Sequence, residues 1–504
     1  MTNVKDCDKI TLPKSISAKT ISAKSFSVTF NGSKVYYTGD YAMLNFRGRK
    51  QELDILQKKY DKGGFCLSVI YGRRRIGKTT LINEFIERQD CKKISFIAVE
   101  QSEKELLNMM KNEVLNALAP EMAEIIGFQD FGSIFEFIGK YARKERVIFF
   151  IDEYPYLAKQ CPYIQSLLQK QIDSNWKNTK LFFIICGSLV GFMKDEVLAE
   201  SAPLHGRSDL EMRLRPFGYE DTALFLDGYT YEEKAVVYGL TGGVAKYIDQ
   251  FDSKVALDEN IKEQFYSIGG YFSEEQVKTV LSSDRQNPAL YNSIISAIAT
   301  GHTKNGEIAG CVGMEEISYP LKVLAKAEII EKRFSPKPYY VLNDSMLEFW
   351  FRYVNPASSL INSGNGEKYY DLKVKDKLHE FMGKIFEKMA KEFLIKNAGM
   401  NGIPLITEIT DYQNTFLDEN RKPVNVELDL LGKLDQKYVL VGECKFKHEK
   451  FDKSELEKVM EKVKYLPAKD VKICLFSLSG FTDHVQKNAE NCLLFSIQDM
   501  YKTE

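Results

Sequence analysis

A glycine-rich turn lies between two regular patterns near the start of the chain. Residues 67–80 read LSVIYGRRRIGKTT and contain the pattern G-x-x-x-x-G-K-[ST] from Gly72 to Thr79. The five apolar or small residues before the turn predict a buried strand, and the sequence LINEFIE after it predicts a helix. This order of strand, tight turn and helix predicts an α/β fold with a parallel sheet.

The turn has the chemistry of a polyphosphate site. Its two glycines permit backbone angles that point successive amide N–H groups inward, and the following helix adds its positive dipole. Lys78 is predicted to reach the β- and γ-phosphates, and the Thr79 hydroxyl to coordinate Mg²⁺. The predicted nucleotide-binding residues of this segment are Gly72, Arg73, Arg74, Arg75, Ile76, Gly77, Lys78, Thr79 and Thr80. The expected ligands are ATP and Mg²⁺; a glycine turn without a ligand is the alternative.

A second strand pattern ends in two acidic residues. The apolar run VIFFI, residues 147–151, is typical of a strand buried on both faces of a parallel sheet. Asp152 and Glu153 follow it directly. In a nucleotide-binding sheet, the aspartate is expected to hold the Mg²⁺ shell and the glutamate to polarise the attacking water.

Two further polar groups are candidates at this edge of the sheet. The strand KLFFIICGS ends in Ser188, which is predicted to sense the γ-phosphate or, alternatively, to cap a helix. Arg207, Arg213 and Arg215 follow in the sequence, and Arg207 is assigned as the charge that stabilises the transferring phosphoryl group. The alternative for these arginines is a solvated loop.

Six motifs carry a family resemblance. FRGRKQEL, GRRRIGKTT, FFIDEYPYL, ICGS, HGR and TGGVAKYI, in this order, resemble the archaeal-type ATPase family within the STAND branch of AAA-related P-loop NTPases. The resemblance spans about residues 43–360. It implies an ATPase core at 43–225, a helical lid at 226–280, and a winged helix at 281–360 that closes over the nucleotide. The family usually has a proline after the lid glycines, whereas this chain has the run Thr241–Lys246 without one.

The winged helix is also predicted from its own pattern. The sequence from Asn287 to Asp344 gives two helices, a third helix with apolar spacing, and a hairpin around Phe334 to Pro338. Five basic residues are candidates for phosphate contacts: Lys322, Lys326, Lys332, Arg333 and Lys337. DNA is therefore a candidate partner, and an intramolecular lid with a solvated face is the alternative.

A new domain is predicted at residues 373–504, after a linker with the sequence INSGNGEKYY. VNVELDLLG alternates, so Asp429 shares one face of a strand with Glu427. A partner strand, YVLVGECKF, places Glu443 and Lys445 on one face. A short turn, GKLDQK, folds the two strands into a hairpin and brings Asp429, Glu443 and Lys445 together.

This hairpin resembles the PD-(D/E)xK nuclease superfamily, written here as Asp429 followed by Glu443-Cys444-Lys445. Glu387, on the preceding helix, matches the additional metal-binding acid of that superfamily. The resemblance implies a restriction-endonuclease-like α/β domain in which Glu387, Asp429 and Glu443 bind metal and Lys445 is catalytic. The same C-terminal region also resembles the poorly characterised domain that often follows archaeal-type ATPases. An exposed hairpin face with ordinary charges is the alternative.

The length and composition of the chain exclude some classes of protein. With 504 residues, about three or four domains are expected, and 69 basic against 70 acidic residues indicate no strongly charged partner. Nine scattered cysteines suit reduced thiols, and the five histidines show no ligand spacing. The N-terminus lacks the pattern of a signal peptide and no apolar run reaches membrane-spanning length, so we expect a cytoplasmic protein with no membrane partner.

Residues 1–42 are expected to form an appendage with a hairpin around Asn31-Gly32. For the whole chain, the main hypothesis is an ATP-hydrolysing switch that controls a nuclease-like domain directed at DNA. The alternative is a DNA- or partner-binding regulatory module in which the nucleotide is structural and the nuclease-like domain is inactive. A second copy of the chain or another protein is a further candidate partner.

Overall fold

The computed structural model describes most of the chain, in residues 25–30, 33–38, 46–273, 287–335, 337–418, 420–468 and 470–502. The chain divides into two compact units, Met1–Phe46 and Arg47–Glu504. In the first unit, strands β1 (Ser25–Phe30) and β2 (Ser33–Thr38) pair antiparallel, as the predicted hairpin requires. The Asn31-Gly32 turn of that hairpin lies outside the described residues.

A five-stranded sheet forms the first part of the second unit. All its neighbouring strands are parallel, in the order β4-β5-β6-β3-β7. The strands are β3 (Cys66–Tyr71), β4 (Lys92–Ile97), β5 (Val147–Asp152), β6 (Leu181–Gly187) and β7 (Leu210–Arg213). Every residue of β5 and β6 is buried, as their apolar runs predicted. Because the strands are parallel, the segments that follow β3, β5 and β6 leave the same edge of the sheet.

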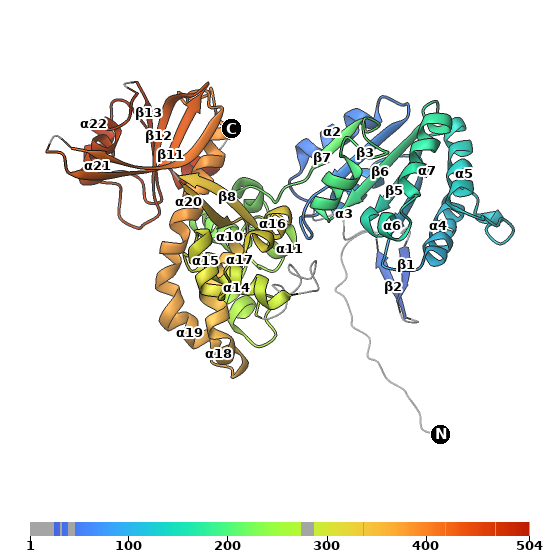
Figure 1. Ribbon diagram of the computed structural model, residues 1–504, viewed down its shortest axis with the longest axis horizontal. Helices are drawn as coiled ribbons and strands as arrows, with labels where there is room; N and C mark the ends of the chain where they lie inside the picture. The colour runs from blue at the N-terminus through green and yellow to red at the C-terminus, as the bar shows by residue number, and fades with distance from the viewer. Residues whose placement is uncertain are drawn as a thin grey trace, which may run out of the picture. The chain divides into compact units, whose positions relative to one another are not determined.

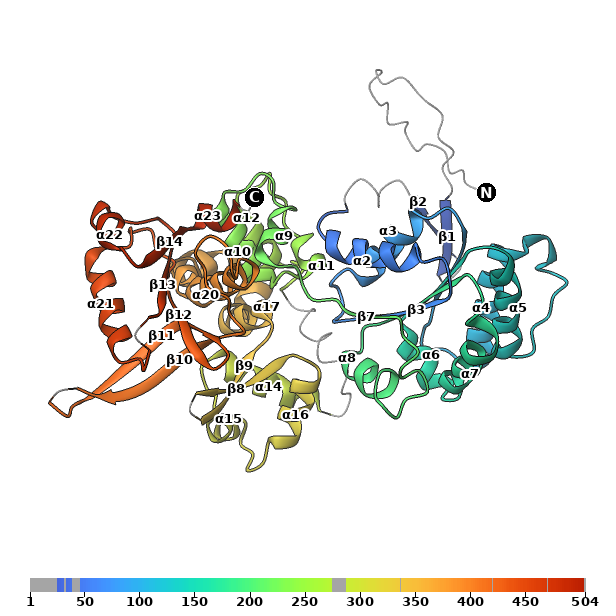
Figure 2. The same cartoon turned by 90° about the horizontal axis from the view of Figure 1, so that it is seen from above.

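Helices cover both faces of this sheet (Figure 2). They are α2 (Lys50–Tyr60), α3 (Lys78–Glu87), α4 (Glu103–Leu118), η1 (Pro120–Met122), α5 (Phe131–Lys144), α6 (Tyr154–Gln160), α7 (Ile164–Gln171), η2 (Ile172–Trp176), α8 (Val190–Phe192) and η3 (Met193–Val197). Leu67 and Val69 of β3 belong to one core with α4 to α7. On the other face, Tyr60 of α2 and Phe85 of α3 pack against Phe182 of β6, with ring centroids 5.5 Å apart in both pairs.

Short helices and a hairpin follow the sheet. The first group is α9 (Tyr219–Ala223), α10 (Tyr231–Thr241), α11 (Ala245–Ile248), α12 (Leu257–Ile261) and η4 (Lys262–Tyr266). The second group is α14 (Pro288–Ala299), α15 (Asn305–Val312), α16 (Ser318–Lys326), β8 (Ile330–Ser335) and β9 (Lys337–Leu342). Phe334 lies opposite Pro338 in the antiparallel β8-β9 pair. Three helices and a hairpin therefore occur in the order expected for a winged helix.

The segment predicted as a linker is helical and packed, so that prediction is wrong. This part of the chain forms α17 (Ser345–Phe349), η5 (Trp350–Val354), η6 (Asn355–Ala357), α18 (Ser358–Asn362), α19 (Gly366–Tyr369), η7 (Tyr370–Val374) and η8 (Lys375–Lys377). The predicted linker, residues 361–370, runs from α18 through α19 to the first residue of η7. Ile361 and Tyr370 are buried. A Cβ atom on Gly366 would lie 2.1 Å from the Tyr266 carbonyl oxygen, so this glycine permits a close backbone approach.

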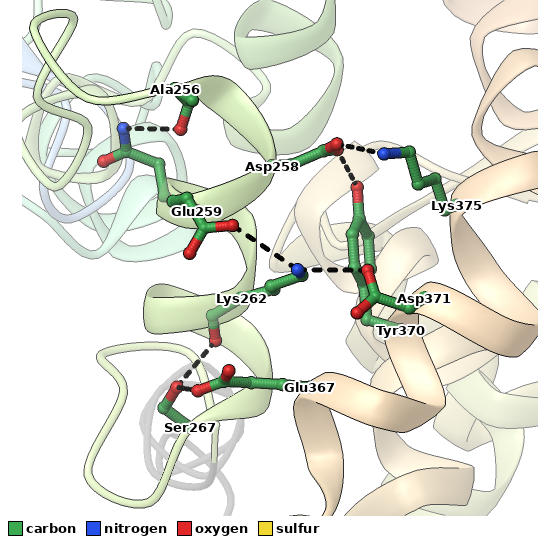
Figure 3. A network of polar contacts seen from close by, with 10 residues as sticks. Ala256, Asp258, Glu259, Lys262, Ser267, Glu367, Tyr370, Asp371 and Lys375 are labelled. Atoms are coloured by element: carbon green, nitrogen blue, oxygen red, sulfur yellow. Dashed lines mark hydrogen bonds and ion pairs between the residues drawn. The ribbon is translucent and has the colours of Figure 1, made fainter.

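Polar contacts also bind this segment to α12 and η4 (Figure 3). The Tyr370 hydroxyl donates to Asp258 at 2.7 Å, and Lys375 pairs with the same carboxylate. Lys262 pairs with Asp371 at 3.1 Å. The packing of these helices therefore continues from the lid region into the C-terminal part of the chain.

The C-terminal part contains a second five-stranded sheet, in the order β10-β11-β12-β13-β14 (Figure 1). Its elements are α20 (Leu378–Lys396), β10 (Glu408–Leu417), β11 (Pro423–Leu434), β12 (Lys437–Lys445), α21 (Lys453–Lys464), β13 (Lys472–Ser477), α22 (Asp483–Asn488), β14 (Cys492–Ser496) and α23 (Ile497–Tyr501). The pairs β10-β11 and β11-β12 are antiparallel, whereas β12-β13 and β13-β14 are parallel.

Helices pack against both faces of the second sheet. Phe393 of α20 contacts Phe476 and Phe495. On the other face, Leu456 and Val459 of α21 share a core with β13. The predicted turn between β11 and β12 is shorter than expected, because the strands continue to Leu434 and from Lys437. Within the described residues, no helix has the length and apolar character needed to cross a membrane.

Candidate functional sites

The glycines of the first turn have specific backbone roles. Gly77 has φ 89° and is the N-cap of α3. This left-handed conformation favours glycine, because a Cβ atom would clash with the backbone. A Cβ on Gly72 would lie 2.3 Å from the Leu214 carbonyl oxygen. The two glycines therefore let the turn close tightly between β3 and α3, as the phosphate-loop prediction requires.

Lys78 lies across the turn. Its side chain is buried, and Nζ donates to the Arg73 carbonyl oxygen at 2.8 Å. Burial lowers the pKa of Lys78, and the nearby Glu153 and Asp152 carboxylates act in the opposite direction. A lysine held in this position points its charge into the turn, where the β- and γ-phosphates are expected.

The predicted magnesium ligands come together. The Thr79 hydroxyl donates to Asp152 Oδ2 at 2.6 Å, although the two residues come from α3 and β5. Asp152 Oδ1 accepts from the backbone N–H of Glu153 at 2.9 Å. A hydroxyl and a carboxylate are hard oxygen donors, which fit Mg²⁺.

Glu153 and Ser188 are also neighbours. Glu153 has φ 48°, and its Oε2 accepts from the Ser188 hydroxyl at 2.7 Å and from the Ser188 N–H at 3.3 Å. Arg74 donates to the Tyr156 hydroxyl at 2.6 Å and lies 3.5 Å from Ser188 Oγ. Ser188 does not cap the next helix, because α8 begins after Leu189, so the alternative of an N-cap is wrong. A sensor role for Ser188 remains a prediction.

The arginines of the following loop have other partners. Arg207 pairs with Asp173 at 2.7 Å and donates to two backbone carbonyl oxygens of its own loop. This contact, with that of Lys177, lowers the pKa of Asp173 to about 2. Arg213 pairs with Glu328 at 2.5 Å. The contacts of Arg207 are thus with its surroundings rather than with the turn, and its catalytic role stays a prediction.

Two arginine contacts of the turn were not predicted. Arg49 donates to the carbonyl oxygens of Ile76, at 3.1 Å, and Arg215, at 2.7 Å. Arg73 pairs with Asp344, which is the N-cap of α17. The run FRGR contains Arg49, but sequence spacing gave no reason to connect it with a turn 27 residues away.

The lid motif contacts the turn through its backbone. Lys246 N–H donates to the Arg75 carbonyl oxygen at 3.1 Å. Gly243 has φ 74°, and its carbonyl oxygen accepts from Phe217 N–H at 2.8 Å. A Cβ on Gly243 would lie 1.9 Å from the Phe217 carbonyl oxygen. The run without a proline therefore still joins the lid to the phosphate loop.

The basic residues near the wing do not form a free row. Lys326 pairs with Asp195, and Arg333 pairs with Glu331 at 3.1 Å. Lys332 lies over the Phe334 ring, 5.3 Å from its centroid. Lys322 is exposed, and the side chain of Lys337 lies outside the described residues. Two of the five candidates therefore already have acidic partners, and DNA contact by this surface stays a prediction.

The predicted C-terminal residues are neighbours on β11 and β12. Asp429 Oδ2 accepts from Cys444 N–H at 2.7 Å. Lys445 Nζ lies 2.8 Å from Glu443 Oε1. Lys462 of α21, which sequence reasoning missed, lies 2.9 Å from Glu443 Oε2. In the sequence, Lys462 is one of several basic residues in the segment that forms α21, so only the packing of α21 against the sheet shows that it belongs to this cluster.

The acids of this cluster interact electrostatically. Burial and the charge of Glu443 raise the pKa of Asp429 to about 6. Burial and the charge of Asp429 raise the pKa of Glu387 to about 8. Within the described residues, however, the oxygens of Glu387, Asp429 and Glu443 do not form a trio with all separations under 4.8 Å. Metal binding by these three acids would therefore require their side chains to draw closer.

Two parts of the chain match known protein families. Residues 46–251 match a family described as an ATPase domain predominantly from Archaea. Residues 350–459 match DUF234, a family of archaeal and bacterial proteins of unknown function. Residues 46–251, which contain the parallel-sheet α/β core, are thus similar to an archaeal-type ATPase domain, and residues 350–459 are similar to a family of unknown function.

Individual proteins are similar to all or part of this chain. An uncharacterised protein of Methanocaldococcus jannaschii is 29% identical over 468 residues, which are 90% of this chain and 99% of that protein. An uncharacterised ATP-binding protein of the same organism is 42% identical over 55 residues, 11% of this chain and 93% of that protein. A Walker-type ATPase of Pyrococcus abyssi has 18% identity and a TM-score of 0.46, over 61% of this chain and 96% of that one.

Proposed function

We propose that this chain binds Mg²⁺-ATP at the turn of residues 72–79 and hydrolyses it with Glu153 as the general base. The observation that carries this proposal is the 2.6 Å hydrogen bond from Thr79 to Asp152, which joins the phosphate-loop helix to the acidic strand end. Glu153 follows directly in the chain and is held by Ser188. Bound Mg²⁺ supplies positive charge against the β- and γ-phosphates.

Different residues bind the phosphates, hold the metal and activate the water. The amides of the turn and Lys78 bind the phosphates, and Thr79 and Asp152 hold the metal. Glu153 orients the attacking water and accepts its proton. Ser188 senses the γ-phosphate through its contact with Glu153, and Arg207 supplies the additional positive charge.

ATP turnover and ATP binding, measured separately, test this assignment. Glu153→Gln is expected to lower kcat by about 100-fold or more while ATP still binds, because only the base is lost. Lys78→Ala is expected to weaken binding itself. Glu136→Gln, which changes an exposed glutamate of α5, is the matched control and should behave as wild type. Equal turnover in wild type and Glu153→Gln would refute the role of the base.

We further propose that the nucleotide state controls a nuclease-like C-terminal domain, in which Glu387, Asp429 and Glu443 bind Mg²⁺ and Lys445 stabilises the developing phosphoryl charge. The contact between α10 and α20 supports this coupling. Tyr238 of the lid helix donates to Glu392 at 2.5 Å, one turn and a half from Glu387 on the same helix. The resemblance to STAND switches points in the same direction.

A specific observation favours the second candidate, an inactive nuclease-like domain in a DNA- or partner-binding module. The Glu443 carboxylate is paired with both Lys445 and Lys462. Two ammonium groups neutralise this acid and compete with a metal ion for its oxygens. In this candidate, the lysine pairs serve stability, and the bound nucleotide is structural.

Cleavage assays distinguish the two candidates. Single- and double-stranded DNA and RNA are incubated with Mg²⁺ or Mn²⁺, with and without ATP. An active site predicts cleavage that is lost in both Asp429→Ala and Lys445→Ala, whereas Glu457→Ala, which changes an acid with 66% side-chain exposure, is the control. Cleavage that persists in all variants comes from a contaminant. Absence of cleavage in folded, ATP-binding wild type favours the inactive domain.

A further inference from the structure

A cluster of two histidines and one glutamate lies away from both candidate sites. Glu232, His379 and His448 each offer a ligand atom, and these atoms all lie within 4.8 Å of one another. Among the residues that the structure describes, this is the one trio of histidine, cysteine or acidic groups that meets this limit. The three residues come from α10, from α20 and from the segment after β12. Sequence spacing did not indicate the cluster, because 147 and 69 residues separate its members.

The side chains face one another closely. His448 Nε2 lies 2.9 Å from Glu232 Oε1. The rings of His379 and His448 have centroids 4.5 Å apart and an interplanar angle of 83°. His379 Nδ1 is shielded from solvent and has no hydrogen-bond partner among the described residues. A buried nitrogen without a partner is unfavourable, and a bound cation would satisfy it.

The surroundings hold two of the three ligands in place. The His379 ring packs beside Phe446, with centroids 5.7 Å apart, and Phe446 is buried against Phe386. The hydrogen bond from Tyr238 to Glu392 fixes α10 against α20. His448, in contrast, has 64% of its side chain exposed and has a polar contact with Glu232. The ligand atoms already lie within 4.8 Å of one another, and a tetrahedral site requires them to reach a separation of roughly 3.3 Å.

We propose that Glu232, His379 and His448 bind a divalent transition metal of the zinc class. Two imidazoles and one carboxylate are ligands that suit Zn²⁺, Co²⁺ or Ni²⁺, whereas Mg²⁺ prefers oxygen ligands alone. The three protein ligands leave a fourth position for water. This site is thus chemically distinct from the two proposed magnesium sites.

The metal would join the lid to the C-terminal domain. Glu232 lies in the first turn of α10, and α10 ends just before the lid run, in which Lys246 N–H donates to the Arg75 carbonyl oxygen of the phosphate loop. His448 lies three residues after Lys445 of β12. One ion bound to both therefore fixes the segment after β12 against the lid helix. This role is structural, and it does not depend on hydrolysis of ATP or of a phosphodiester.

Zinc titration of the full chain tests the site. The protein is stripped with a chelator, exchanged into excess Mg²⁺, and titrated with Zn²⁺ against a chromophoric competitor. Wild type is expected to bind one equivalent more than His448→Ala, and Glu232→Gln is expected to bind this equivalent at least tenfold more weakly. His484→Ala removes an exposed histidine of α22 and should match wild type. The cysteines are unchanged in every variant, so the difference isolates the cluster.

Two further readouts keep the test decisive. Co²⁺ bound at the cluster should give visible d–d bands without a thiolate charge-transfer band, and these should be absent in His448→Ala. Zn²⁺ should raise the Tm of wild type but not of His448→Ala, because only the intact site links metal binding to folding. The exposed position of His448 makes its variant suitable, and circular dichroism checks that it is folded. Equal zinc stoichiometry and affinity in wild type, His448→Ala and His484→Ala would overturn the proposal.

Discussion

At the scale of single residues, the hydrogen bond from Ser188 to Glu153 gives a prediction about catalysis. The hydroxyl lies 2.7 Å from Oε2 and restricts the predicted base to one orientation. Ser188→Ala should lower kcat by about tenfold and change ATP affinity by less than about twofold, because it removes orientation rather than phosphate contact. Single-turnover hydrolysis and equilibrium binding measure the two quantities.

Ser188→Thr is the control for this prediction, since it keeps the hydroxyl. It should retain most of the turnover. A Ser188→Ala variant with weakened ATP binding and normal turnover of bound ATP would contradict the orienting role, and would instead indicate direct contact with the nucleotide.

Glu387 predicts a dependence of stability on pH. Its pKa is raised to about 8 by burial and by Asp429, against about 4.3 in an unfolded chain. Between these values the folded protein binds more protons than the unfolded chain, so this contribution to stability is complete below about pH 4 and is lost as the pH rises through 8. Without divalent cations, the Tm of Glu387→Gln should fall less than that of wild type between pH 5 and 8.

A glutamate on the same helix provides the comparison. Glu380 has 66% of its side chain exposed, so Glu380→Gln should keep the pH profile of wild type. Parallel Tm profiles for wild type and Glu387→Gln would show that Glu387 is ionised in the folded protein near neutral pH, against the expectation.

At the scale of elements, the lid motif depends on one close backbone approach. Gly243 has φ 74°, and a Cβ atom there would lie 1.9 Å from the Phe217 carbonyl oxygen. Gly243→Ala should therefore lower stability by more than about 2 kcal/mol, because the clash adds to the cost of the left-handed conformation. It should also weaken ATP binding, since the same run donates a hydrogen bond to Arg75.

Gly313 is a matched glycine for this measurement. It has φ 68°, but a Cβ atom there would meet nothing within 4 Å. Gly313→Ala should cost only about 1 kcal/mol in denaturant unfolding and leave ATP affinity unchanged. Equal effects of the two changes would show that the close approach at Gly243 is not important.

At the scale of the whole molecule, the buried pair of Arg73 and Asp344 connects the phosphate loop to α17. Asp344 has only 1% of its side chain exposed. Asp344→Asn keeps an oxygen for the helix cap but leaves the Arg73 charge without its partner. We expect a loss of about 3 kcal/mol of stability, measured by thermal or denaturant unfolding. ATP should reduce the difference in stability between wild type and Asp344→Asn, because its phosphates offer Arg73 a new negative partner.

An exposed ion pair is the control for that change. Asp249 pairs with Lys246 while 68% of its side chain is exposed, so Asp249→Asn should change stability by less than about 1 kcal/mol. If ATP stabilised wild type and Asp344→Asn equally, Arg73 would not exchange its acidic partner for phosphate.

A continuous set of contacts also connects the two ends of the second unit. The backbone carbonyl oxygen of Arg75 accepts from Lys246 N–H, the lid run follows α10, and Tyr238 of α10 donates to Glu392 of α20. The same helix α20 carries Glu387 and His379. Such contacts give a physical basis for coupling nucleotide binding to the C-terminal domain. The free energy of unfolding of the double mutant Gly243→Ala with Glu392→Gln, compared with those of the two single variants, measures the coupling free energy between the two positions.

The sequence by itself determined the features that depend on neighbouring residues. The strand, turn and helix around Gly77 follow from local pattern, and the meeting of Thr79 with Asp152 follows because parallel strands end at the same edge. The alternation in β11 and β12 likewise predicted that Asp429, Glu443 and Lys445 would be neighbours. Short-range backbone geometry leaves few alternatives in such cases.

The tertiary structure decided those contacts between distant segments that no strand order or alternation relates. The segment around Gly366 has the composition of a linker, yet Gly366 permits close packing against Tyr266. The linker prediction failed because composition does not distinguish a flexible glycine from a tightly packed one. The contacts of Lys462 with Glu443, and of His448 with Glu232, join elements that no sequence period relates. Their positions follow from the packing of whole helices and sheets, and local patterns carry no information about that packing.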